Sequence, residues 1–221
     1  VGQTITASNV PVGTYVSAIT GGAGSVKSFQ LSQAATSSAT VSFTVTVPTG
    51  SYNVAIGSYA LDATTTGYSN IAIGYNAGGA FTDNHNNIAI GYGALEDANA
   101  GEHTNIAIGN YALGAETTGA VGCVAIGYKA LEDQNVAAAA NVAVGYNVAK
   151  NLTLGTDSVY VGYQAGGSGV IEGVKNIVIG SSAALNATDM NHSVFIGSFA
   201  GGLGVIEGAS NVVVGYAAGL N

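Results

Sequence analysis

One short phrase recurs ten times along the chain and constrains its fold more than any other feature. In its commonest form the phrase is Asn-Ile-Ala-Ile-Gly, and alanine follows the glycine by three positions in nine copies. Self-similarity at a short, nearly fixed period is typical of a repeat architecture. The closing glycines, which succeed one another every 17 or 18 residues, are Gly57, Gly74, Gly91, Gly109, Gly127, Gly145, Gly162, Gly180, Gly197 and Gly215.

Each phrase predicts a short β-strand. The positions one and three before the glycine are always Ile or Val, the period-2 alternation of a strand, and glycine permits the positive φ of a corner. A unit of this length cannot enclose a core alone, but stacked units bury a continuous column of side chains. The sequence therefore predicts an all-β fold with a parallel β-solenoid, or β-roll, of ten coils over residues 51–221. At about 4.8 Å per coil it would be about 48 Å long.

The residue in the middle of each phrase is apolar in every copy. Because a residue that points away from a coil's core is normally polar when it meets water, we predict that the strand is covered on both faces. In this interpretation Ile and Val fill the core and the middle residue faces another subunit. The predicted interface residues are Ala55, Ala72, Ala89, Ala107, Ala125, Ala143, Tyr160, Val178, Phe195 and Val213.

The opening position of the phrase is small and polar in nearly all copies. Such residues at one angular position of successive coils can form a ladder of bonds to the corner backbone. We expect a structural ladder, with a buried and inert thiol at its one cysteine. Its members are Asn53, Asn70, Asn87, Asn105, Cys123, Asn141, Ser158, Asn176, Ser193 and Asn211.

Residues 1–50 lack the repeat and contain both prolines of the chain. Residues 41–47 alternate apolar and polar side chains and are followed by Pro48-Thr49-Gly50, which indicates an amphipathic strand that ends in a turn. Residues 4–6 and 15–19 suggest further strands. We predict a small antiparallel β module over residues 1–50, ahead of the solenoid.

The iterated phrase resembles the head repeats of trimeric adhesins of the YadA type and the closely similar repeats of bacteriophage tail fibres, over residues 53–219. The opening VGQTITASNVPVGTYVSAITG, with the KSFQLSQAAT strand after it, resembles a small β module common in phage virion proteins. The 17- to 18-residue period favours the phage variant. The resemblance implies a homotrimer of parallel solenoids that is displayed outside a cell or virion and used for attachment.

Charge and composition exclude several functions. Twelve carboxylates stand against four lysines and no arginine, for a net charge of −8, so we expect no nucleic-acid partner. The single cysteine excludes an intrachain disulfide framework. There is no long apolar run and no signal-peptide pattern, so we expect no membrane insertion. The chain begins at Val1, which suggests a processed or trimmed piece, and we expect further chain or another virion protein to cover the C-terminal coil.

No catalytic motif is found, and we expect a non-enzymatic protein without cofactor or metal. His85 and His103 fall on adjacent coils, where a metal or anion site is the alternative to a plain polar ladder. The acidic pairs Glu96-Asp97 and Glu132-Asp133 indicate a solvated face. A column of tyrosines directly after the coil glycine can stack on sugars or seal a subunit interface. Its members are Tyr75, Tyr92, Tyr128, Tyr146, Tyr163 and Tyr216.

Three functions remain open at this level. The first is a virion fibre, of a phage tail or head, that extends towards a host surface receptor and helps attachment, with a glycan as one candidate for the receptor. The second is the head of a bacterial trimeric surface adhesin. The third is a passive extracellular filament or spacer. The expected location is the virion, with the bacterial cell surface as the alternative.

Overall fold

A computed structural model describes residues 16–20, 28–31, 50, 52–98, 101–115, 119–134, 140–167, 173–202 and 207–219. Throughout these ranges all regular secondary structure is β. The chain divides into two compact units, Val1–Thr46 and Val47–Asn221. Each unit is described by itself.

The N-terminal unit contains one antiparallel strand pair among its described residues. Strand β1, Val16–Thr20, pairs with β2, Ser28–Leu31, and the register shifts between Val16 and Ala18. The strand pair is consistent with the predicted antiparallel module. The strands expected at residues 4–6 and 41–47 lie outside the described residues.

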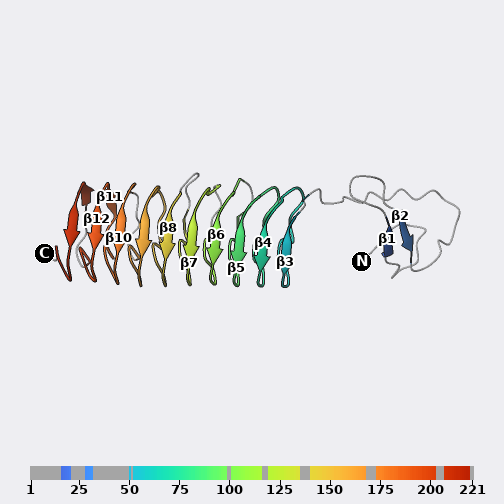
Figure 1. Ribbon diagram of the computed structural model, residues 1–221, viewed down its shortest axis with the longest axis horizontal. Helices are drawn as coiled ribbons and strands as arrows, with labels where there is room; N and C mark the ends of the chain where they lie inside the picture. The colour runs from blue at the N-terminus through green and yellow to red at the C-terminus, as the bar shows by residue number, and fades with distance from the viewer. Residues whose placement is uncertain are drawn as a thin grey trace. The chain divides into compact units, whose positions relative to one another are not determined.

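The second unit is a parallel β-solenoid, as predicted. Ten three-residue strands form one sheet in which neighbours in space are successive coils (Figure 1). A smaller parallel pair, β11 (Asp189–Asn191) with β13 (Glu207–Ala209), lies on two of the later coils. The strands of the main sheet are β3 (Val54–Ile56), β4 (Ile71–Ile73), β5 (Ile88–Ile90), β6 (Ile106–Ile108), β7 (Val124–Ile126), β8 (Val142–Val144), β9 (Val159–Val161), β10 (Ile177–Ile179), β12 (Val194–Ile196) and β14 (Val212–Val214).

All strand pairs share one register, so equivalent residues stand in straight columns. Ala72, for example, pairs with Ala55 on one side and with Ala89 on the other. The glycine that ends each strand makes the corner, with φ between 129° and 144°. A Cβ at Gly91 would lie 2.5 Å from the carbonyl oxygen of Gly109 in the next coil, so this position requires glycine both for its backbone conformation and for space.

The middle residue of each strand points into the coil, which overturns the predicted subunit interface. Ala72, Ala89, Ala107, Ala125, Ala143, Tyr160, Val178 and Phe195 are all completely buried within their own chain. Ala55 is exposed and Val213 partly exposed on the two outermost strands of the sheet. The prediction was wrong because alternating apolar residues do not say which face is inside, and the narrow coil leaves room for only a small side chain in most copies.

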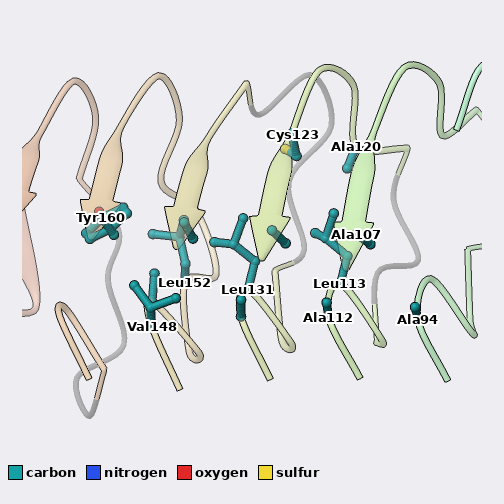
Figure 2. Close-up of a cluster of buried hydrophobic side chains, with 14 of the residues drawn as sticks. Ala94, Ala107, Ala112, Leu113, Ala120, Cys123, Leu131, Val148, Leu152 and Tyr160 are labelled. Carbon is teal, nitrogen blue, oxygen red and sulfur yellow. The ribbon is translucent and has the colours of Figure 1, made fainter. Parts of the chain in front are cut away.

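Across the coil interior, the size of the middle residue is balanced by the residue four positions after the corner glycine. Ala107 faces Leu113, and Figure 2 shows Leu113 directed into the coil beside Ala107. Where the strand carries Tyr160 or Phe195, the facing position is Gly166 or Gly201. In the two coils whose middle alanine faces Gly78 or Ala149, buried Phe81 and Leu152 supply the missing volume. In these coils a small side chain on one wall is thus accompanied by a larger one on the other or next to it.

The polar ladder runs along the inner edge of the sheet. The backbone N–H of Asn70 donates to Oδ1 of Asn53 at 2.9 Å, and the N–H of Asn87 donates to Oδ1 of Asn70 at 3.0 Å. The serines continue the pattern, since Oγ of Ser158 accepts from the N–H of Asn176 at 2.9 Å. Most asparagines also donate through Nδ2 to a carbonyl oxygen of the following turn. These contacts tie each coil to the next.

Candidate functional site

The outer face of the ten-stranded sheet is apolar along its whole length. The Ile and Val residues on either side of each middle residue point outward, and none of them is buried. Ile71, Ile177 and Ile196 are between 37% and 41% exposed. Each of them lies on a strand that is paired on both sides, so their exposure is not an effect of the end of the sheet. No charged side chain interrupts the two columns. They consist of Val54, Ile71, Ile88, Ile106, Val124, Val142, Val159, Ile177, Val194 and Val212, and of Ile56, Ile73, Ile90, Ile108, Ile126, Val144, Val161, Ile179, Ile196 and Val214.

The prediction that these Ile and Val residues fill the core is wrong. A signal for the correct assignment was present in the sequence. In eight of the ten coils either alanine at the middle position accompanies leucine six residues later, or a larger middle residue accompanies glycine or alanine there, as expected of two residues that share one enclosed volume. The choice between Ile and Val at the flanking positions shows no such relation to the residue across the coil.

The predicted tyrosine column lies on the surface and stacks on itself. Ring centroids are 5.0 Å apart for Tyr75 and Tyr92, 5.0 Å for Tyr128 and Tyr146, and 5.5 Å for Tyr146 and Tyr163, with interplanar angles of 18° or less. Each of these rings therefore has at least one face covered by another tyrosine. Tyr216 stands apart from this stack and has an edge contact with Phe199.

The column is interrupted at Asn110, and neighbouring side chains bridge the gap. Tyr111 makes an edge contact with the ring of Tyr92, with centroids 5.3 Å apart. The ammonium of Lys129 lies 5.4 Å from the ring centroid of Tyr111 and 5.7 Å from that of Tyr128. Aromatic and cation–π contacts thus extend without a break from Tyr75 to Tyr163.

The acidic pairs are less solvated than expected. Glu132 forms salt bridges with Lys129 at 2.8 Å and with Lys150 at 3.3 Å. Glu96 accepts a hydrogen bond from Nδ2 of Asn76 at 2.7 Å. Asp97 and Asp133 are exposed. Only the aspartate of each pair therefore fits the predicted solvated face.

Cys123 is completely buried, as expected of a ladder position. Nε2 of the buried Gln134 lies 3.2 Å from the sulfur, and Oε1 of Gln134 accepts from Nδ2 of Asn141 at 3.0 Å. Gln134 therefore connects the one thiol of the ladder to the next asparagine. Gln134 lies in the variable half of its coil and is not among the residues that the repeat predicts.

The two stacked coils at His85 and His103 contain a second group of titratable side chains. The imidazole centroids are 3.6 Å apart, and the ring of Tyr68 stacks on His85 at 4.7 Å. Directly beside them, inside the coil, Glu102 is completely buried; its carboxylate accepts from Nδ2 of Asn84 at 2.6 Å and from the N–H of Gly119 at 3.0 Å. Glu102 is not among the residues predicted from the sequence, because small or apolar residues occupy its position in most coils.

Burial determines the titration behaviour of this group. It raises the pKa of Glu102, against the lowering effect of the hydrogen bonds that the carboxylate accepts. It lowers the pKa of His103, and the neighbouring His85 lowers it further. Burial also raises the pKa of Tyr160, the largest middle residue, to about 12.

Among the described residues, no three or more His, Cys, Asp or Glu side chains are arranged so that they could hold a metal ion. The described part of the chain also has no helix that is long and apolar enough to cross a membrane. Comparison with protein-family models, with curated proteins and with solved structures gives no match to this chain.

Proposed function

We propose that this chain is a non-enzymatic structural and adhesion protein: a virion fibre, of a phage tail or head, that extends towards the host surface and helps attachment. The observation that carries the proposal is the unbroken apolar outer face of a long, in-register solenoid. A soluble chain rarely exposes so extended an apolar surface unless another molecule covers it. The resemblance of the repeat to phage fibre and adhesin repeats supports the same function.

The partner on this face is two further copies of the same chain in a parallel homotrimer. A partner must match columns of Ile and Val that repeat at every coil over ten strands. A copy of this chain, aligned in parallel, offers the same periodicity and the same lack of charge. Three chains, rather than two, follow from the resemblance to trimeric adhesins. The proposed interface is formed by the outward Ile and Val residues. It lies on the opposite face of the same strands from the middle residues, where the sequence predicted it.

The arrangement of the tyrosine column distinguishes between two ways in which such a fibre could serve attachment. Sugars bind aromatic side chains through the face of the ring. Because the stacked tyrosines cover one another's faces, they fit a lateral contact between chains better than a glycan platform. This observation favours a second candidate, a passive spacer whose host-binding part lies elsewhere. A bacterial surface adhesin head remains the alternative for the location.

The oligomeric state tests the interface. Native mass spectrometry or sedimentation of the purified chain should give three times the chain mass of 21.6 kDa. The double variant Ile90→Asp/Ile108→Asp places two charges on the outer face and should dissociate the trimer. Asn110→Asp adds charge at an exposed position of the same region and should leave it intact. A monomeric wild type at micromolar concentration would contradict the proposal.

Binding to cells separates the two candidate functions. Fluorescently labelled trimer would be incubated with a panel of intact bacteria, with and without enzymatic removal of surface polysaccharide. Saturable binding to particular strains supports direct attachment, and its loss after the enzymatic treatment identifies a glycan receptor. A stable trimer that binds no strain of the panel supports the passive spacer.

A further inference from the structure

His85 and His103 form a contact between coils that depends on the protonation state of one ring. The two residues are bridge partners on successive coils, and both side chains are half-buried. The ring centroids lie 3.6 Å apart with 29° between the ring planes. The backbone N–H of His85 donates to Nδ1 of His103 at 3.3 Å. This nitrogen can accept only while it carries no proton.

The two imidazoles have different surroundings. The ring of His85 is stacked on Tyr68 on its other side, at 4.7 Å and 9°. The next bridge partner of His103 is Val121, which has no ring. A proton on Nδ1 of His103 would turn an acceptor into a donor that faces another donor, the backbone N–H of His85.

The other titratable groups around the pair do not neutralise it with a fixed ion pair. Tyr68, Asp83 and Glu102 are the described titratable residues that interact with the two histidines or lie beside them. The carboxylate of Asp83 acts on His103 in the direction that favours the proton, but it is outweighed by burial and by His85. Glu102 points into the coil, where its oxygens accept from Asn84 and Gly119.

We propose that the His85–His103 pair is an acid-sensitive contact, and that protonation of His103 loosens the corner between these two coils while the adjoining strands stay paired. At this corner the N–H of Thr104 donates to the carbonyl of His85 at 3.1 Å, next to the bond from the His85 N–H to the His103 ring. Inside the coil the same two coils are also joined by Nδ2 of Asn84, which donates to the carboxylate of Glu102. On the following coil the N–H of Gly122 donates to the carbonyl of His103 at 3.2 Å. The strands β5 and β6 are held independently, by their own ladder and by Asn87 and Asn105. This inference does not depend on the proposed function.

Hydrogen exchange measured by mass spectrometry at pH 7.5 and pH 5.0, corrected for the intrinsic pH dependence of exchange, tests the proposal on the full chain. Protection of peptides covering 83–87 and 101–104 should fall roughly tenfold at pH 5.0, which corresponds to a decrease of about 1.4 kcal/mol in the free energy of opening. Peptides confined to β5 and β6 should keep their protection.

The matched variant is His103→Asn, because its side-chain oxygen takes the place of Nδ1 as an acceptor but cannot be protonated. It should fold at pH 7.5 with wild-type protection and lose none at pH 5.0. His192→Asn removes an exposed histidine of a later coil and should behave as wild type. Equal protection of 83–87 at both pH values in the wild type would overturn the proposal, and so would an equal loss in His103→Asn.

Discussion

Val213 and Gly219 face each other across the interior of the last described coil: a Cβ added to Gly219 would lie 3.2 Å from Cγ1 of Val213. In four earlier coils the same two positions hold Ala and Leu. In the coil before the last they hold Phe195 and Gly201. One enclosed volume is thus divided between two residues that are six positions apart. This relationship makes the solenoid core testable one coil at a time.

The first prediction concerns this shared volume. Phe195→Ala alone should destabilise the protein by about 3–5 kcal/mol, because it leaves a cavity in a completely buried site. Adding Gly201→Leu should recover a large part of the loss, since Leu occupies the equivalent position opposite alanine elsewhere. Urea denaturation of both single variants and the double variant gives the coupling energy. Additive effects would contradict the shared volume.

The second prediction separates backbone strain from steric clash at glycine. Gly91→Ala should cost more than about 4 kcal/mol or prevent folding, because its Cβ would meet the Gly109 carbonyl at 2.5 Å and φ is 135°. Gly122→Ala provides the control, with φ of 73° and no atom within 4 Å of the added Cβ. It should cost only about 1–2 kcal/mol. If urea denaturation gave a similar loss of stability for both variants, the neighbouring coil must move to make room for the added Cβ, and the prediction would be wrong.

The third prediction concerns the polar ladder. Asn87 is completely buried; its Oδ1 accepts from the N–H of Asn105 at 2.9 Å and its Nδ2 donates to the carbonyl of Glu102 at 2.8 Å. Asn87→Ala should cost about 1–3 kcal/mol for each backbone group left unsatisfied. Asn87→Ser should cost less, because Ser158 accepts the equivalent bond. Asn110→Ala removes only an exposed bond, from the N–H of Tyr92 to Oδ1 of Asn110 at 3.3 Å, which water can replace, and should change the thermal midpoint little.

The fourth prediction concerns the buried carboxylate of Glu102. Its pKa is raised in the folded protein, so the folded state binds the proton more readily than the unfolded state. As the pH falls from neutral through the folded pKa to about 4.5, the wild type should therefore gain stability relative to Glu102→Gln. The variant keeps the shape of the side chain but does not titrate. Urea denaturation from pH 7.5 to 4.5 measures the difference, and a difference that does not change with pH would contradict the assignment.

His103 should show the opposite sign. Its pKa is lowered in the folded protein, so the wild type should lose stability relative to His103→Asn as the pH falls through about 6.5 and below. The same series of denaturation curves separates the two groups. An effect of the same sign for both variants would mean that a third group dominates the titration.

Much of the candidate site could be predicted from the spacing of the repeat. The spacing of the glycines placed His85 beside His103 and aligned the tyrosines, because a fixed repeat puts equivalent residues in one column. It did not place the imidazoles face to face, nor reveal that Glu102 is enclosed beside them. Those contacts depend on which way each side chain leaves the backbone at a corner, and the repeat does not specify this in the variable half of the coil.

The sequence by itself determined the number of coils, their register, the glycine corners and the position of the polar ladder, since each follows from a residue type that recurs at one place in every copy. Only the tertiary structure decided which face of the strands is inside. Ile-Ala-Ile is apolar on both faces, so alternation cannot distinguish them. The inner face is decided by how close the strand lies to the chain segment across the coil. Ala107 is small enough to fit against Leu113 inside the coil, whereas the bulkier Ile106 and Ile108 point outward, where another chain can cover them.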